Sequence, residues 1–134
     1  MIPRGIHHVG VAVVDLEQAV DTYVGLLGGT VEHQASLAVQ GVEAVSVLLG
    51  SGRIELLAPT GEDTPVGRFL ARRGPGMHHV AYEVGDVAEA LAGLRAAGAR
   101  LVDEEPRTGL FGLQVAFVHP DAVHGVLTEV VSHG

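Results

Sequence analysis

One segment of this chain occurs twice, and the repeat constrains the fold more than any other feature. Ile6–Val13 (IHHVGVAV) returns 71 positions later as Met77–Val84 (MHHVAYEV). The correspondence continues beyond the segment, because Asp15 recurs as Asp86 at the same offset. A repeat of this kind indicates a duplicated supersecondary unit. We therefore expect two copies of one module, each with a His-His pair near its start.

Hydrophobic periodicity predicts the elements of the first copy. Alternating valines indicate a strand over 6–13, and Asp15 begins an amphipathic helix that ends at Gly28-Gly29. Further strands are expected at 30–37, 42–49 and 53–58, with the last two joined by a Gly50-Ser51-Gly52 turn. The first copy therefore has the order βαβββ.

The second copy repeats this order after a linking segment. A short helix is expected over 65–72, and the Gly74-Pro75-Gly76 break follows it. The expected elements of the second copy are a strand at 78–84, a helix from Asp86 to about Gly98, and strands at 100–103, 113–118 and 126–131. We predict an α+β fold in which two tandem βαβββ modules form a curved mixed sheet around a metal cleft, with helices outside. Residues 1–60 would form the first module, 61–76 the linker and 77–134 the second module of one compact domain.

Composition excludes several functional classes. The net charge of −8 argues against a nucleic-acid partner, since phosphate binding needs a basic face. The chain has no cysteine and no lysine, which removes disulfides, thiolate catalysis and Schiff-base chemistry. No apolar run reaches the roughly 18 residues of a membrane span, and the first residues lack a signal-peptide pattern. We expect a cytoplasmic protein without a membrane partner.

Strand alternation distinguishes the two histidines of each pair. In the first copy His7 shares a face with three valines, whereas His8 shares the opposite face with small residues. In the second copy His78 and His79 divide in the same way. A bulky face packs under a helix, and a face of small residues leaves room for a ligand. The pattern favours His8 and His79 as ligands, the alternative being ordinary surface or core histidines.

Each last strand also carries one carboxylate among apolar residues. Glu55 lies in RIELL and Glu129 lies in LTEVV. A buried, unpaired carboxylate is costly, and a metal ion or a cationic partner would remove that cost. A sheet edge that faces water is the alternative. Two histidines and two carboxylates suit a divalent transition metal, and this donor set fits Co, Ni, Mn, Fe or Zn.

These residues lead to a known family. The duplicated βαβββ order with His8, Glu55, His79 and Glu129 resembles the vicinal oxygen chelate superfamily, and within it the methylmalonyl-CoA epimerases. The matching segments are IHHVGVAV at 6–13, GSGRIELLAP at 50–59, GMHHVAYEV at 76–84, FVHP at 117–120 and GVLTE at 125–129. The resemblance covers essentially the whole chain. It implies that the four residues bind one divalent ion, with Co²⁺ favoured and Mn²⁺, Ni²⁺ or Zn²⁺ as alternatives, in a homodimer that acts on an acyl-CoA.

The resemblance also implies a reaction. The expected activity interconverts (2R)- and (2S)-methylmalonyl-CoA through a metal-stabilised enolate, with carboxylates as acid and base. One branch of the family places a catalytic Glu on the third strand, after a Gly-Val. The ungapped match falls on Ala44, and Glu43 lies one residue away. We predict Glu43 as the catalytic residue, the alternative being an exposed carboxylate at the strand entry.

Other functions fit the same pattern less closely. A glyoxalase-type isomerase uses a similar shell of two His and two Glu. A ring-cleaving dioxygenase typically keeps two His and one carboxylate. A metal-free binding protein of the drug-sequestering type would have non-ligands at these positions. The Gly-rich segment 109–112 is either a backbone site for the substrate carboxylate or an ordinary surface loop.

Overall fold

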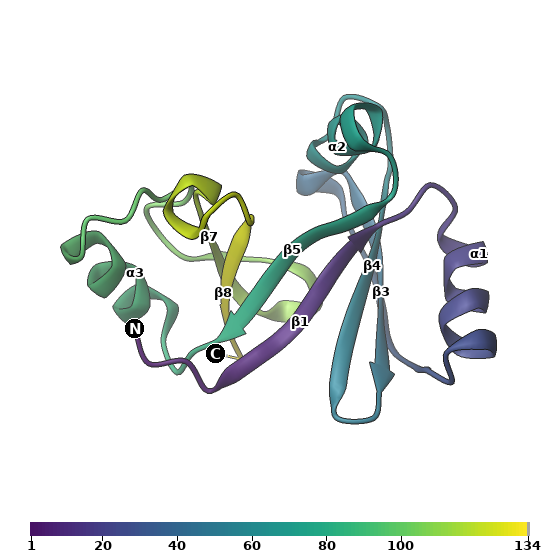
Figure 1. Ribbon diagram of the computed structural model, residues 1–134, viewed down its shortest axis with the longest axis horizontal. Helices are drawn as coiled ribbons and strands as arrows, with labels where there is room; N and C mark the ends of the chain where they lie inside the picture. The colour runs from purple at the N-terminus through teal and green to yellow at the C-terminus, as the bar shows by residue number, and fades with distance from the viewer. Residues whose placement is uncertain (134) are drawn as a thin grey trace. The chain divides into compact units, whose positions relative to one another are not determined.

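The computed structural model describes residues 1–133 and divides into two compact units. One unit comprises His8–His78, and the other comprises Met1–His7 together with the chain from His79 onward. Each unit contains one module with the predicted βαβββ order (Figure 1). By contacts, residues 1–7 group with the second module, and the linking segment 61–76 groups with the first. The module boundaries at 60 and 76 stay a prediction.

The first module has a mixed four-stranded arrangement. Its strand order is β2-β3-β4-β1, in which β1 is parallel to β4 and the other pairs are antiparallel. The elements are β1 (Gly5–Ala12), α1 (Leu16–Asp21), the π-helical turn η1 (Thr22–Leu26), β2 (Thr30–Leu37), the 3₁₀ turn η2 (Ala38–Gln40), β3 (Val42–Leu49) and β4 (Gly52–Pro59).

The first helix begins where the sequence predicts and changes type before its expected end. The Asp15 carboxylate accepts a hydrogen bond from the backbone N–H of Gln18 at 3.0 Å, which caps the helix. The α-helical pattern ends at Asp21. The Thr22 hydroxyl donates to the Gln18 carbonyl at 3.1 Å, and the Leu27 N–H donates to the Thr22 carbonyl at 3.3 Å. Such back-bonding competes with the regular ladder, so the expected helix to Gly28 finishes as a π turn.

The second module repeats the first at the predicted offset. Its strand order is β5-β8-β7-β6, with β5 parallel to β8 and the other pairs antiparallel. The Asp86 carboxylate caps its helix through the Glu89 N–H at 3.0 Å, as Asp15 does in the first module. The elements, after the linking helix α2 (Pro65–Arg73), are β5 (Gly76–Glu83), α3 (Val87–Ala96), β6 (Arg107–Thr108), η3 (Leu110–Gly112), β7 (Gln114–Val118), η4 (Pro120–Val123) and β8 (Thr128–Ser132).

One predicted strand is wrong. Residues 100–103 form only an isolated bridge, between Leu101 and Val118. The N–H groups of Val102 and Asp103 both donate to the Phe117 carbonyl, at 3.0 and 3.1 Å. The Phe117 N–H donates instead to the Asp103 carboxylate at 2.8 Å, so a side chain replaces the main-chain acceptor that would extend the ladder. The short β6 pairs with the other end of β7 instead.

Each helix covers one face of its module. In the first module Val45, Val47 and Leu56 are buried against α1 residues that include Leu16 and Val20. In the second module Leu91 of α3 packs in the same way on Ala116 and Val130 of the strands and on Val84, which directly follows β5. The alternate residues of these strands therefore point away from the helices, and the predicted site residues lie among them.

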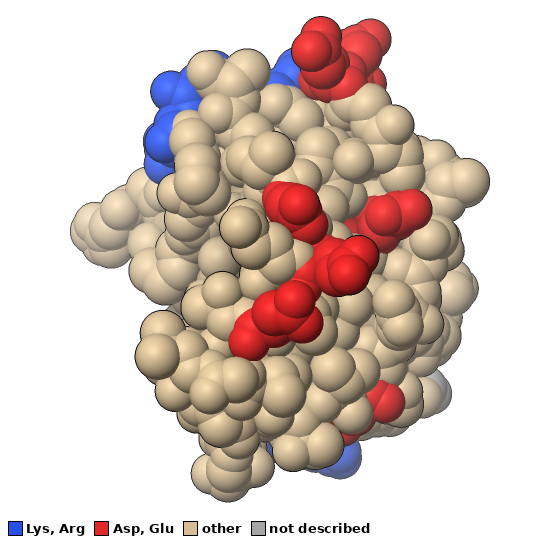
Figure 2. Space-filling model, turned by 90° about the vertical axis from the view of Figure 1, so that its right-hand side faces the viewer, with Lys and Arg blue, Asp and Glu red and all other residues tan. Residues whose placement is uncertain are grey.

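The surface agrees with the acidic composition. Figure 2 shows one face of the molecule, on which acidic side chains are spread widely and basic side chains lie only near the upper and lower edges. Within residues 1–133, the structure contains no helix that is both long and apolar enough to cross a bilayer.

Candidate metal and active site

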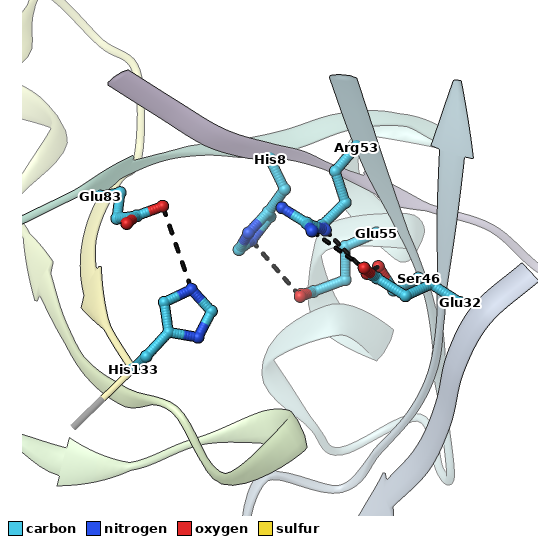
Figure 3. Close-up of polar contacts among 7 residues, drawn as sticks. All are labelled: His8, Glu32, Ser46, Arg53, Glu55, Glu83 and His133. Carbon is cyan, nitrogen blue, oxygen red and sulfur yellow. Dashed lines mark hydrogen bonds and ion pairs between the residues drawn. The ribbon is translucent and has the colours of Figure 1, made fainter. Parts of the chain in front are cut away.

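The first module places one imidazole beside one carboxylate. In the parallel pair β1–β4, Gly10 lies opposite Glu55, and His8 is two residues before Gly10 on the same face. The His8 Nε2 atom lies 3.4 Å from the Glu55 Oε2 atom (Figure 3). Both residues are buried, with 2% and 6% of their surface exposed.

The second module repeats this arrangement. Ala81 lies opposite Glu129 in the parallel pair β5–β8, and His79 is two residues before Ala81. The His79 Nε2 atom lies 3.6 Å from the Glu129 Oε1 atom, and the two residues are 4% and 7% exposed. In both modules the second histidine of the pair lies beside the carboxylate, as strand alternation predicts.

The spacing within each pair suits a shared metal ion. A charge-assisted hydrogen bond between nitrogen and oxygen measures about 2.7–2.9 Å, so both pairs are wider than such a bond. Two donors bound to one ion at roughly 2.0–2.2 Å lie about 3.0–3.5 Å apart at octahedral or tetrahedral angles. A buried carboxylate also needs a positive partner, which a divalent cation supplies. The donor set and its spacing therefore fit a divalent metal.

Aromatic contacts orient the second pair. The Phe117 ring packs edge-on against the His79 imidazole, with centroids 5.7 Å apart and planes at 86°. The Arg107 guanidinium lies 5.5 Å from the centroid of the Phe117 ring. Sequence reasoning did not identify Phe117 or Arg107, although Phe117 lies directly opposite Glu129 in the register of β7 and β8. Phe117 therefore packs against the His79 ring, and Arg107 lies over Phe117.

A network of charged and polar side chains joins β2, β3 and β4 of the first module. Arg53 donates from Nε and Nη2 to the two carboxylate oxygens of Glu32, at 2.7 and 2.9 Å, and the Ser46 hydroxyl donates to Glu32 at 2.9 Å (Figure 3). The Arg53 hydrogen bond is the main cause that lowers the pKa of Glu32 to about 2; burial opposes the shift, and the Ser46 hydrogen bond adds to it. Ser46 lies opposite Glu55 in the register of β3 and β4. Glu32 is therefore ionised at neutral pH and is a weaker base than an ordinary carboxylate.

The strand register places Glu43 away from the Glu55 side of the strands. Ser46 pairs with Glu55, so the even-numbered residues of β3 share the Glu55 face. Val42 and Ala44 are the buried residues of that set at this end of the strand. Glu43 is exposed and points to the opposite face. Its role as the base stays a prediction that this register does not favour.

The remaining predicted features lie outside these pairs. The His78 imidazole packs edge-on against Phe69 at 5.0 Å between centroids, and burial lowers its pKa. Phe111 lies within the Gly-rich segment 109–112 and has a left-handed backbone, with φ of 59°. Such a conformation is uncommon for a residue other than glycine.

Comparison with known proteins shows the family to which the chain belongs. The family model of the Glyoxalase/Bleomycin resistance protein/Dioxygenase superfamily matches residues 7–117. The mitochondrial methylmalonyl-CoA epimerase of Bos taurus is 40% identical over 126 residues, which are 93% of this chain and 72% of the relative. The ethylmalonyl-CoA/methylmalonyl-CoA epimerase of Cereibacter sphaeroides is 39% identical over 132 residues, which are 97% of this chain and 98% of the relative.

A solved structure extends the similarity to three dimensions. A methylmalonyl-CoA epimerase in complex with methylmalonyl-CoA and NH₄⁺ superposes with a TM-score of 0.93 and 37% identity, over 98% of this chain and 95% of the other. Agreement over nearly the whole chain confirms the predicted fold class, with two βαβββ modules and mixed strands.

Proposed function

Because the chain belongs to the methylmalonyl-CoA epimerase family of the glyoxalase, bleomycin resistance protein and dioxygenase superfamily, we propose that it interconverts (2R)- and (2S)-methylmalonyl-CoA. It is an enzyme of the epimerase class. The solved relative that holds methylmalonyl-CoA supports an acyl-CoA thioester as the substrate. The observation that carries the proposal is the pair of buried His–Glu contacts, repeated with the same register in both modules.

We propose that these two pairs together hold one divalent ion. His8 and His79 would contribute imidazole nitrogens, and Glu55 and Glu129 would contribute carboxylate oxygens. A bound divalent ion supplies Lewis acidity, which lowers the free energy of negative charge on a carbonyl oxygen by several kcal/mol. We expect Co²⁺, and reconstitution with Mn²⁺, Ni²⁺ and Zn²⁺ will rank the alternatives by restored activity.

The protein must also move a proton at C2 of the substrate. This carbon lies between a thioester and a carboxylate, and epimerisation removes its proton on one face and returns a proton on the other. The chain has no lysine or cysteine, so the acid and base come from its carboxylates, histidines or tyrosines. Burial of a carboxylate raises its proton affinity, which favours buried carboxylates over exposed ones for this role.

The Glu43→Gln variant tests the predicted base directly. Glu43 is exposed, and its side chain lies on the other face of β3 from that of Ser46. We therefore expect the rate of C2 proton exchange to stay within a few-fold of the wild-type rate. A general base would instead lose roughly 10²–10⁴-fold. Exchange measured separately from each epimer distinguishes the outcomes, and a large loss from one epimer would establish Glu43 as the base for that face.

Proton–deuterium exchange tests the proposed reaction. We expect the enzyme to introduce deuterium at C2 of methylmalonyl-CoA in D₂O and to convert a single epimer into a mixture, both followed by NMR. Protein treated with a chelator serves as the control for spontaneous exchange. A glyoxalase-type isomerase would introduce no more deuterium at C2 than the chelator-treated control, and that result would contradict the proposal. The same assay with ethylmalonyl-CoA measures the substrate preference.

The expectation about the assembly state rests on the family resemblance alone. We propose a homodimer, and light scattering coupled to size-exclusion chromatography measures it. A monomeric mass under the conditions of the activity assay would contradict this expectation.

A further inference from the structure

A second group of metal-ligating side chains lies within the unit that contains the second module. His7, Glu83 and His133 each offer one ligand atom, and these atoms lie within 4.8 Å of one another. His133 Nε2 lies 4.0 Å from Glu83 Oε1 (Figure 3), and the His7 and His133 rings are 5.5 Å apart between centroids. None of the three belongs to the proposed catalytic pairs.

Three elements that are distant in the sequence bring these residues together. Glu83 ends β5 and lies opposite Val131 of the parallel strand β8, so His133 follows two residues beyond that pairing. The start of the chain runs along the end of β5, where the Arg4 N–H donates to the Glu83 carbonyl at 2.7 Å. This contact brings His7 to the same end of the strands.

We propose that His7, Glu83 and His133 form a second site for a divalent transition metal, distinct from the catalytic ion. Two imidazoles and one carboxylate are a common ligand set for such ions and leave positions open for water. Donors on one ion lie about 3.0–3.5 Å apart, so binding requires only small side-chain movements. His133 is the most accessible member, since 66% of its side chain is exposed, whereas His7 is 7% exposed.

A positive charge beside the second site should weaken its affinity for a divalent metal. Arg4 Nη1 lies 4.0 Å from the second carboxylate oxygen, Oε2, of Glu83, and its side chain is 68% exposed. A cation bound to Glu83 would be repelled by this guanidinium. The Arg4→Gln variant should therefore bind the metal about 2- to 10-fold more tightly, the scale expected of one charge near the surface. Unchanged or weaker binding would place the ion away from Glu83 and overturn the proposal.

The site is best tested in a protein that lacks the catalytic ligand His79. We expect full-length His79→Ala, freed of metal by chelation, to bind one equivalent of Zn²⁺ in a competition titration with a chromophoric chelator. Adding His133→Ala should abolish that binding, and adding Glu83→Gln should weaken it at least tenfold. Adding His33→Ala, which removes an exposed histidine from β2, should leave it unchanged.

Two results would overturn the second site. One is the absence of Zn²⁺ binding in the His79→Ala protein, and the other is binding that survives His133→Ala. The readout is stoichiometry and affinity, so it does not depend on epimerase activity. Failure of the proposed function would appear in the exchange assay on wild-type protein, and the two failures are therefore distinguishable. His133→Ala on the wild-type background should lower the metal content from two equivalents to one.

Discussion

Replacing His79 with alanine is expected to remove the catalytic metal and nearly all epimerase activity, whereas replacing His78 with alanine should leave both. His79 is buried beside Glu129 at 3.6 Å, and His78 packs against Phe69. Loss of Lewis-acid stabilisation worth several kcal/mol corresponds to a fall of about 10³-fold or more in kcat. Elemental analysis and the C2 exchange assay measure the two effects.

The neighbouring histidines make this a matched comparison. Both variants remove one imidazole from β5, and their positions differ by one residue, so they differ mainly in the face that loses its side chain. Circular dichroism verifies that both variants are folded. The assignment of the strand faces would be reversed if the His79→Ala protein kept the metal of the catalytic site and the His78→Ala protein lost it.

Replacing Glu32 with glutamine is expected to lower the free energy of unfolding at neutral pH and to flatten its dependence on pH in acid. The shift of the Glu32 pKa from 4.5 to about 2 corresponds to about 3 kcal/mol. About a fifth of the side chain remains exposed, and solvent screening reduces the expected loss to roughly 1–2 kcal/mol. Urea denaturation at several pH values measures it.

The sign follows from linkage. The pKa is lower in the folded state, so the stabilisation is fully present above about pH 4.5 and is lost as the pH falls towards about 2. The wild-type and Glu32→Gln curves should therefore converge in acid. Asp63→Asn breaks an exposed ion pair with Arg68 and serves as the control, for which we expect no measurable change. A constant difference between wild type and Glu32→Gln across this range would contradict the account.

The structure corrects the sequence prediction where local pattern was ambiguous. The strand expected at 100–103 is reduced to one bridge, because the Asp103 side chain replaces a main-chain acceptor at β7. The first helix changes type at Thr22 because a hydroxyl competes for a helical carbonyl. In both places a side chain forms a hydrogen bond to the backbone that competes with regular secondary structure. Hydrophobic periodicity carries no information about such side-chain hydrogen bonds.

The amino-acid sequence alone determined the duplicated module, the two helix caps and the histidine of each pair that lies beside a carboxylate. These features are local, since strand alternation and capping depend on residues only a few positions apart. Tertiary structure alone decided the register that pairs Ser46 with Glu55 and leaves Glu43 on the opposite face. It also decided the bond between Glu32 and Arg53 and the meeting of His7, Glu83 and His133. Those contacts join strands that are distant along the chain, and their pairing depends on how whole elements pack, which no local period encodes.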